Sequence, residues 1–480
     1  MACEWGSVSA TGHSEYTPLA IPDGMGGAIV VWSVDLLDTQ NQAVALQRLS
    51  AAGSRLWGPA VACVVARGDS ADDNVRKAIC PDGSGGAIVV WADFRNGDGD
   101  IYAQHVTAAG SVEWEPNGLL VCNAAGKQRF PAVAADGSGG AIIVWVDRRA
   151  GNSDIYAQRV SAAGDTVWTG GAVPLSNLVG DQQSPTIIPD GSGGAFVTWA
   201  DVDIHAQRIA ADGTQQWATN GVAVCTAADD QNAPRIIPDG ASGAIIAWDD
   251  LRSRATSGHD IYAQRLSSDG TVQWAPNGVP VVTEAGDQTP FDMIPDGTGG
   301  CLFAFAQQDI YAQRILSDGT RPSPWPATGV ALCSAPGDQQ TPVICTDGSG
   351  GAIVAWADLR DNPTNEDDIY ATRIDSNGHV AGTLAVADHG SYSLVSIEPN
   401  PAVGRVRFRV GQTRGLSQTR RLRRCWRCLR SLENNRLSAG DYTIVWNGLD
   451  AEGRKPAPGV YLAVWSIDGV QSSRRLVLLH

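Results

Sequence analysis

Short apolar runs separated by glycine-rich turns dominate the chain up to about Val386. Runs such as AIVVW (87–91) and AIVAW (352–356) are continuously apolar and rich in β-branched residues, as strands covered on both faces of a sheet are. Segments such as DIYAQRV (154–160) also carry polar residues, which is typical of strands nearer a sheet edge. With 55 glycines and 25 prolines in 480 residues, the pattern predicts many short strands joined by tight turns and no long amphipathic helix.

The strands belong to a repeat that is marked by an Asp-Gly dipeptide. Its aspartates are Asp23, Asp82, Asp136, Asp190, Asp239, Asp296 and Asp347. Each copy has about 50 to 60 residues and contains a Pro-led apolar stretch, a glycine-rich turn, an AIVVW-like run, a variable loop, a DIYAQRV-like run and a final Trp with G-x-x-V. Four short strands in a unit of this length indicate a propeller blade, because β-helix coils are shorter and separate sandwiches need about 100 residues each. We therefore predict an all-β protein with a seven-bladed β-propeller over residues 1–388.

The two ends of the repeat region suggest how the ring closes. Six copies carry the final Trp, at Trp57, Trp114, Trp168, Trp217, Trp274 and Trp325, whereas the last copy lacks it. An unmatched Trp5-Gly6-x-Val8 precedes the first copy. We predict that this segment completes the outer strand of the last blade; the alternative is a truncated longer array.

Most of the ten cysteines occupy repeat positions that hold aliphatic residues in sister copies. Cys63, Cys122, Cys225 and Cys333 stand where others have Leu175 or Val282, and Cys80 and Cys345 stand where others have Ile188 or Ile237. Equivalent positions in different blades are too far apart for a disulfide, whose Cα atoms lie within about 7 Å. We predict small buried free thiols and few or no disulfides.

A different pattern begins at SIEPNPAVGRVRFRV (396–410). The segment 437–480 alternates apolar and polar residues in three predicted strands, with turns at Asn447-Gly448, Pro458-Gly459 and Asp468-Gly469. The Pro-Asn-Pro at 399–401, the A-G-x-Y-x-x-x-W-x-G run from Ala439 to Gly448, Gly453 and the P-G-V-Y at 458–461 resemble the immunoglobulin-like domain of the flagellar hook-capping protein FlgD and the C-terminal sorting domains of type IX secretion substrates. The resemblance implies a small Ig-like β-sandwich over 396–480, export and surface attachment in a bacterium, and no catalytic residues.

The resemblance lapses in an arginine-rich segment at 411–436, where the alternation is lost. A basic nucleic-acid patch, a zinc or redox site at Cys425 and Cys428, and a local reading-frame error are three explanations. A lone C-x-x-C is weak evidence for a metal, and enrichment in Arg, Cys and Trp favours the reading-frame error. We expect the sandwich to be interrupted here.

Charge and hydropathy limit the function classes. A formal net charge of −16 argues against nucleic-acid binding, because phosphate contacts need a concentrated basic patch. No apolar stretch approaches the roughly 20 residues that span a bilayer. Met1–Val8 lack the basic and apolar regions of a signal peptide, so an extracellular or cell-surface protein would have lost its true beginning in this sequence.

Carboxylates recur with the repeat. They are Asp93, Asp147, Asp201, Asp250 and Asp358 after the strand Trp, and Asp100, Asp154, Asp203, Asp260, Asp309 and Asp368 before the Tyr or its counterpart His205. Because an active site is normally unique, we predict turn-capping and inter-blade hydrogen bonds for them. The alternative is calcium at NGDGD (96–100) and NEDD (365–368); no other cofactor and no catalytic motif is indicated.

A ligand site is predicted where the loops vary. In a four-stranded blade the loop between strands two and three shares a face with the connection to the next blade, and these loops differ most in length. The candidate residues are Arg95, Arg149, Arg252 and Arg360, with the Gly-Asp-Gln connectors at 180–182, 286–288 and 337–339. The competing interpretation is that these arginines only pair with adjacent aspartates.

We therefore expect a non-enzymatic, exported binding and display scaffold, monomeric, with a protein or glycan partner. A carbohydrate-active propeller enzyme is the alternative, and it would need a carboxylate pair that breaks the repeat. A degraded gene product is a third hypothesis.

Overall fold

The computed structural model describes residues 15–35, 42–57, 62–66, 76–360, 368–381 and 384–385 of the repeat region. Further along, it describes 392–398, 406–412, 416–424, 427–433, 436–437, 440–446, 449, 454–455, 459–467 and 470–478. Gly6–Leu384 form one compact unit, and Ala385–His480 fall in a second. Within these ranges, no helix has the length and apolar character needed to cross a membrane.

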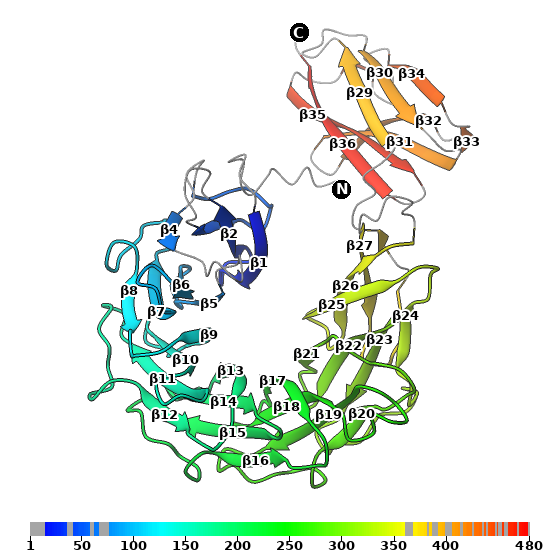
Figure 1. Ribbon diagram of the computed structural model, residues 1–480. Coiled ribbons are helices and arrows are strands. Elements are labelled where there is room, and N and C mark those ends of the chain that lie inside the picture. Colours follow the sequence, from blue (N-terminus) through cyan, green and yellow to red (C-terminus); the bar gives the residue numbers. More distant parts are fainter. Residues whose placement is uncertain are drawn as a thin grey trace. The chain divides into compact units, whose positions relative to one another are not determined.

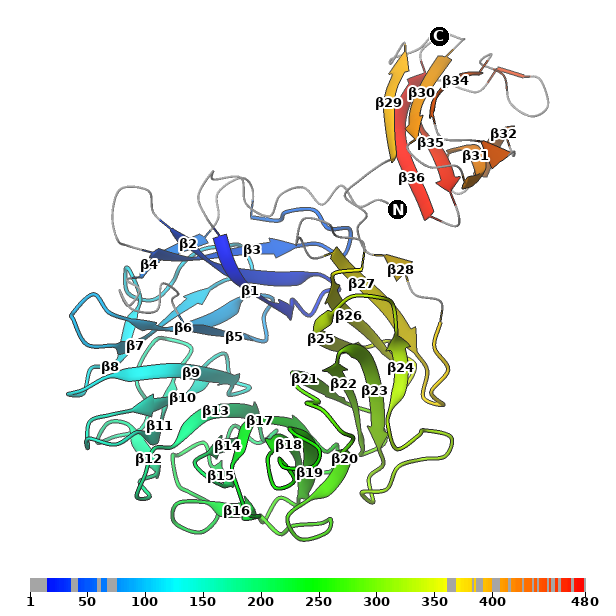
Figure 2. The same cartoon turned by 45° about the vertical axis from the view of Figure 1, so that its right-hand side comes forward.

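The first unit is a seven-bladed β-propeller, which confirms the fold predicted from the repeat. Seven antiparallel four-stranded sheets are each built from four consecutive strands (Figures 1 and 2). The first strands are β1 (Glu15–Pro22), β5 (Lys77–Pro81), β9 (Gln128–Ala135), β13 (Gln183–Pro189), β17 (Gln231–Pro238), β21 (Phe291–Pro295) and β25 (Gln339–Thr346). The second strands are β2 (Ala28–Asp35), β6 (Ala87–Asp93), β10 (Ala141–Asp147), β14 (Ala195–Ala200), β18 (Ala244–Asp250), β22 (Cys301–Gln307) and β26 (Ala352–Asp358).

The outer half of each blade has the same order. The third strands are β3 (Gln42–Leu49), β7 (Asp100–Val106), β11 (Asp154–Val160), β15 (Ile204–Ile209), β19 (Asp260–Leu266), β23 (Asp309–Ile315) and β27 (Asp368–Ile374). The fourth strands are β4 (Ala62–Ala66), β8 (Leu119–Cys122), β12 (Val173–Ser176), β16 (Val222–Cys225), β20 (Val279–Val282), β24 (Val330–Cys333) and β28 (Leu384–Ala385). Blades 1 to 7 are numbered in this order. First strands of successive blades contact one another, so they form the inner wall of the propeller.

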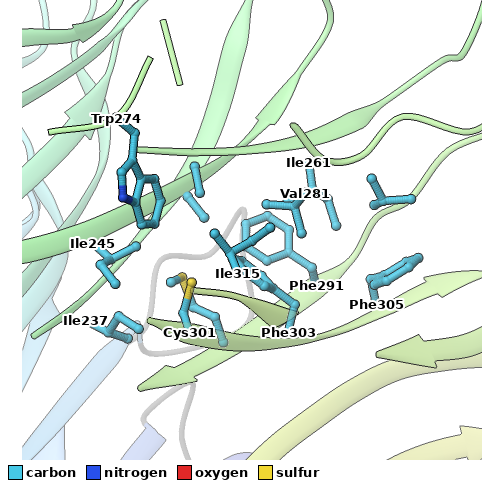
Figure 3. Packing of buried hydrophobic residues seen from close by; sticks show 14 residues of the cluster. Ile237, Ile245, Ile261, Trp274, Val281, Phe291, Cys301, Phe303, Phe305 and Ile315 are labelled. Atoms are coloured by element: carbon cyan, nitrogen blue, oxygen red, sulfur yellow. The ribbon is translucent and has the colours of Figure 1, made fainter. Parts of the chain in front are cut away.

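The continuously apolar runs are the buried second strands. Every residue of β10 is buried, and β10 pairs with β9 on one side and β11 on the other. In the middle of the propeller, one face of such a strand packs on the preceding blade and the other on the following blade, as β18 does through Trp248 toward Phe196 and through Ile245 toward Phe303. Between blades 5 and 6, for example, Ile245 and Trp274 pack with Phe303 in one apolar cluster (Figure 3). A fully buried side chain of this kind contributes about 2 to 3 kcal/mol of transfer free energy.

The Asp-Gly turns join neighbouring blades as well as strands. Oδ1 of Asp136 accepts the backbone N–H groups of Ser138 and Gly140, at 2.7 and 2.9 Å. Its Oδ2 accepts Arg159 Nε at 2.9 Å, and Arg159 Nη1 donates to the carbonyl of Ala211 in the next blade at 3.0 Å. A Cβ on Gly140 would lie 2.3 Å from a backbone oxygen, so only glycine fits this turn.

The last blade takes its outermost strand from its own repeat. The sheet order β25-β26-β27-β28 ends at Leu384–Ala385. The predicted contribution of Trp5 to Val8 concerns residues that lie outside the described part of the chain.

The second unit contains two antiparallel sheets. One has the order β29-β30-β34, from β29 (Tyr392–Glu398), β30 (Val406–Gln412) and β34 (Gly440–Trp446). The other has the order β32-β31-β35-β36, from β31 (Leu416–Arg424), β32 (Arg427–Glu433), β35 (Gly459–Ile467) and β36 (Val470–Leu478), and β33 (Arg436–Leu437) pairs with β31. The arginine-rich segment carries the paired strands β31 and β32, with two register shifts between them. Main-chain pairing requires no particular side chain, and the expected interruption of the sandwich stays a prediction.

Candidate functional site

A group of five side chains covers the seam between blades 2 and 3 at the end of β10. Trp145 Nε1 donates to Asp147 Oδ2 at 2.8 Å, and Arg149 donates to both oxygens of that carboxylate at 2.9 and 2.6 Å. The Arg149 guanidinium lies 4.0 Å from the ring centroid of Tyr156 and donates to Sγ of Cys122, in blade 2, at 3.2 Å. We call this set, the Trp, Asp, Arg and Tyr of one blade with the Cys of the preceding blade, the arginine lid.

Arg149, Arg252 and Arg360 lie in such lids, and Arg95 makes the same contacts within its own blade, the side chain of Cys63 lying outside the described residues. Each pairs with the aspartate two residues earlier and stacks on the tyrosine of the third strand: Arg95 with Asp93 and Tyr102, Arg149 with Asp147 and Tyr156, Arg252 with Asp250 and Tyr262, and Arg360 with Asp358 and Tyr370. The hydrogen bond to Asp147 raises the pKa of the Arg149 guanidinium above its ordinary value. The structure thus engages these guanidinium groups with their own blades, and their contact with a ligand stays a prediction.

The cysteines of the fourth strands do more than fill space. Cys122, Cys225 and Cys333 each accept a hydrogen bond from the lid arginine of the following blade, at 3.2, 3.2 and 2.8 Å. Where the following blade has no lid arginine, the position holds Leu175 or Val282. The prediction of small buried free thiols is confirmed at these three positions, and each thiol is in addition a hydrogen-bond acceptor. Among the described side chains the free cysteines are Cys80, Cys122, Cys225, Cys301, Cys333 and Cys345, of which Cys345 is exposed rather than buried.

The loops between second and third strands lie beside the connections to the next blade, as the topology predicted. In blades 3 and 4, the Gln182 backbone N–H donates to the Ser153 carbonyl at 2.7 Å, and Asp181 Oδ1 accepts the Ser153 N–H at 2.8 Å. The same backbone bond joins Gln128 to Gly99, Gln231 to Val202, Gln288 to His259 and Gln339 to Gln308. The predicted connectors 180–182, 286–288 and 337–339 are all part of this surface, which we call the connector face.

Blade 6 lacks the lid and has a cavity instead. Phe305 replaces the tryptophan, Gln307 replaces the aspartate, and the loop is so short that Asp309 of β23 follows without an arginine. The cavity has a volume of about 850 Å³. Its lining comprises Glu284, Ala285, Gly286, Asp287, Thr289, Pro290, Ala306, Gln307, Gln308, Asp309, Tyr311, Thr328, Asp338, Gln339, Gln340 and Thr341.

One ring and one carboxylate of this cavity lack the partners that their sister residues have. Tyr311 stacks on Phe305 at 5.6 Å and 17°, but no guanidinium covers the ring as in blades 2, 3, 5 and 7, among the described residues. Asp154 accepts a hydrogen bond from Asn152, whereas Asp309 has no such donor in the described part of the chain. Burial raises the pKa of the Asp309 carboxyl, and burial together with this carboxylate raises the pKa of Tyr311.

The cavity wall is acidic and amide-rich. Four carboxylates contribute to it, and none of its lining residues is Lys, Arg or His. Gln339, which is 1% exposed, has an Oε1 without a hydrogen-bond partner among the described residues. The corresponding oxygens of Gln128, Gln182, Gln231 and Gln288 share this property, so it belongs to the repeat and does not distinguish blade 6.

Blade 4 also lacks a lid and brings together Asp201, Asp203 and His205. Their ligand atoms lie within 4.8 Å of one another, and this is the group of possible metal ligands among the described residues. At the predicted calcium segment 96–100, Asn96 Nδ2 donates to Asp100 Oδ2 at 3.0 Å, a contact within the loop itself. Residues 365–367 of the other predicted segment lie outside the described residues.

The blade 6 cavity was not predicted from the sequence, because candidate sites were sought only where characteristic residues are present. The signal was an absence: the W-x-D-x-R pattern becomes F-A-Q-Q-D at 305–309, and the preceding fourth strand has Val282 in place of cysteine. Both substitutions are visible once the thiol and the arginine are known to be partners. The recurring aspartates do cap turns as predicted, since the Arg149 N–H donates to Asp147 Oδ1 at 2.9 Å.

No protein-family model matches the chain, and no curated protein matches it. Among solved structures, a protein of unknown function from Bacteroides caccae is 15% identical, with 62% of this chain and 93% of that chain covered and a TM-score of 0.29. PorZ, a surface component of the type IX secretion system of Porphyromonas gingivalis, is 11% identical over 98% of this chain and 71% of that chain, with a TM-score of 0.36. An acylaminoacyl peptidase from Pyrococcus horikoshii is 10% identical over 84% and 58%, with a TM-score of 0.43. At these values the likeness concerns the fold alone.

Proposed function

We propose that the protein is a non-enzymatic, exported bacterial binding scaffold whose ligand site is the blade 6 cavity on the connector face. The observation that carries this proposal is that blade 6 lacks the arginine lid, as blade 4 does, but keeps the tyrosine of the third strand and has a cavity where the lid would be. In blade 3 the protein's own guanidinium fills the seam, whereas in blade 6, which has no lid, a cavity of about 850 Å³ is available. Concave sites of this volume, with a few convergent polar groups, are typical of ligand pockets.

The proposal keeps the predicted face but moves the ligand away from the four arginines. The guanidinium groups of the four predicted arginines donate hydrogen bonds to buried carboxylates. These arginines are Arg95, Arg149, Arg252 and Arg360. The cavity lining includes Asp287 and Asp338, which belong to the connectors 286–288 and 337–339, two of the three segments predicted from sequence. The partner is a protein or a glycan.

The second unit is proposed to be the Ig-like sandwich that serves export and surface attachment. The support is the resemblance of its sequence to sorting domains, and its two antiparallel sheets of three and five strands are consistent with a sandwich. On this proposal the propeller is displayed at the cell surface as a monomer.

The test fills the cavity with a bulky side chain at an exposed position, where the substitution should not disturb the fold of the blade. Ala285 is exposed on the cavity wall and directly precedes Gly286, as exposed Ala125 precedes Gly126 in a connector without a cavity. The full chain, Ala285→Trp and Ala125→Trp are screened on arrays of glycans and peptides. We expect Ala285→Trp to lose binding by at least about tenfold, and Ala125→Trp to bind like the parent. Binding that survives in Ala285→Trp would overturn the site.

A glycoside hydrolase is the second candidate, because one cavity carboxylate breaks the repeat. Glu284 stands where sister connectors have Ala124 and Leu178, and it shares the cavity with Asp309, whose raised pKa suits a proton donor. Incubation of the chain with the glycans bound on the array tests this. Products that appear with the parent and disappear with Glu284→Gln would favour the enzyme, whereas intact glycans would favour the scaffold.

A further inference from the structure

The four stacked arginines show what the Tyr311 ring is built to contact. In blades 2, 3, 5 and 7 a guanidinium lies 3.8 to 4.3 Å from the centroid of the equivalent tyrosine ring. In two of these blades the opposite partner of the tyrosine is a stacked tryptophan, as for Trp91 with Tyr102 (21°) and Trp356 with Tyr370 (20°). Phe305 and Tyr311 repeat this stack at 17° in blade 6, and the third layer is missing.

The charge around the vacant position matches a cation. Glu284, Asp287, Asp309 and Asp338 all line the cavity, and no basic residue belongs to its lining. Asp309 has no hydrogen-bond donor among the described residues, and Asp338 lacks the loop N–H that its sister Asp181 accepts. A cation stacked on an aromatic face within about 6 Å gains about 0.5 to 2 kcal/mol, and a hydrogen bond to a carboxylate strengthens it further.

We infer that the blade 6 cavity binds a guanidinium group from a ligand, stacked on Tyr311 and hydrogen-bonded to Asp309, in the place of the arginine that this blade lacks. The inference rests on the proposed function and specifies its ligand chemistry. A planar guanidinium is favoured over an ammonium because it stacks flat on the ring and presents several N–H donors in one plane, as Arg149 does toward Tyr156 and Asp147.

Two sources could supply this group: a free small guanidine, or an arginine side chain of a partner protein. The cavity volume of about 850 Å³ is at the scale of a drug-sized ligand, larger than a single side chain requires. Neighbouring residues of a peptide would therefore also find room. The connector carboxylates Asp287 and Asp338 lie in position to contact them on either side of the loop Gln307–Asp309.

The experiment measures binding of the full chain to agmatine, to the peptide Gly-Gly-Arg-Gly-Gly, and to its citrulline and lysine analogues by titration calorimetry. Citrulline has nearly the shape of arginine without the charge. We expect the arginine peptide to bind at least about tenfold more tightly than the citrulline peptide, with the lysine peptide in between. Binding of agmatine as tight as that of the arginine peptide identifies a small guanidine, and binding of the peptide alone identifies a protein partner.

Variants separate the site from the fold. Tyr311→Leu and Asp309→Asn should each weaken binding of the better guanidinium ligand by about tenfold or more, whereas Tyr156→Leu, in a blade with a lid, should leave it unchanged. Equal affinity for the arginine and citrulline peptides, or no binding of either, would overturn the guanidinium inference. If the ligands found on the arrays still lost affinity in Ala285→Trp, the proposed binding site would stand without the guanidinium inference. If Ala285→Trp bound those ligands like the parent, both the binding site and the guanidinium inference would fail.

Discussion

Blades 3 and 6 are built from the same four strands and differ at one end of them. Blade 3 closes its seam with Arg149, which joins a carboxylate, a tyrosine ring and a thiol of its neighbour. Blade 6 keeps the tyrosine but has neither the arginine nor the thiol, and it opens a cavity. This difference is the basis of the proposed site: blade 6 lacks the side chain that supplies the internal guanidinium, and we propose that an external guanidinium takes its place.

The largest expected effect comes from breaking the lid of blade 3. Arg149→Met leaves the fully buried Asp147 carboxylate without its cation, so the free energy of unfolding should fall by about 2 to 3 kcal/mol. Gln307 occupies in blade 6 the repeat position that Asp147 has in blade 3. Gln307→Ala should change the free energy of unfolding by less than about 0.5 kcal/mol. Urea unfolding followed by tryptophan fluorescence compares the two. Equal losses would mean that the lid does not stabilise its seam.

The tyrosines offer the next contrast. Tyr156→Leu removes the ring under a guanidinium, while Tyr311→Leu removes a ring that no guanidinium of the described residues covers. The first substitution should therefore cost about 1 kcal/mol more unfolding free energy than the second, measured by the same unfolding assay. A larger loss for Tyr311→Leu would show that the ring of blade 6 has a structural partner of its own.

The thiols should give a smaller effect in the same direction. Cys122→Val removes the acceptor of the Arg149 hydrogen bond and should lower the unfolding free energy by about 1 kcal/mol. Val282→Cys installs a thiol next to a blade without an arginine and should stay within about 0.5 kcal/mol of the parent. Both changes keep the side-chain volume close, so differential thermal unfolding can rank them. Indistinguishable variants would reduce these cysteines to the small hydrophobes that the sequence indicated.

Two aspartates of blade 6 should respond to pH with opposite sign. Because burial raises the pKa of Asp309, the folded state binds more protons than the unfolded state above the ordinary Asp pKa of about 3.9, and stability falls as pH rises through that window. Asp309→Asn should remove this slope and be more stable at pH 7 by up to about 0.5 kcal/mol.

For Asp296, burial is outweighed by hydrogen bonds from Thr298 and Arg314, and its pKa is lowered. Its contribution is present above the ordinary pKa and is lost as pH falls through the lowered one. Unfolding measured from pH 3 to 7 shows both slopes. A parallel response of Asp309→Asn and the parent would contradict the assigned burial.

The sequence predicted the fold well because the blade's determinants are local and repeated. Each Asp-Gly aspartate caps its own turn, and each AIVVW-like run is the second strand of its blade, so seven copies report the same structure independently. The positions of the loops and connectors followed from strand order alone. The cavity did not follow from strand order. It is recognised by the absence of a contact that other blades have, such as that between Cys122 and Arg149, and these residues are 27 positions apart, so their pairing becomes visible only in three dimensions. The Asp201, Asp203 and His205 group was missed for a different reason: turn capping was predicted for the two aspartates, and His205 was treated as the counterpart of the repeat tyrosine.

Hydrogen bonds between neighbouring blades are of two chemical kinds: those to a backbone carbonyl and those between two side chains. The two kinds place different demands on the sequence of the neighbouring blade. Arg159 and the Nε1 of Trp168 both donate to the backbone carbonyl of Ala211 in the following blade. Any residue supplies such a carbonyl, so a duplicated unit can be inserted after any other and still engage it. The thiol–guanidinium hydrogen bond requires two matched side chains on neighbouring copies. It therefore forms only where neighbouring copies carry both the cysteine and the arginine, as at the seams between blades 2 and 3, 4 and 5, and 6 and 7.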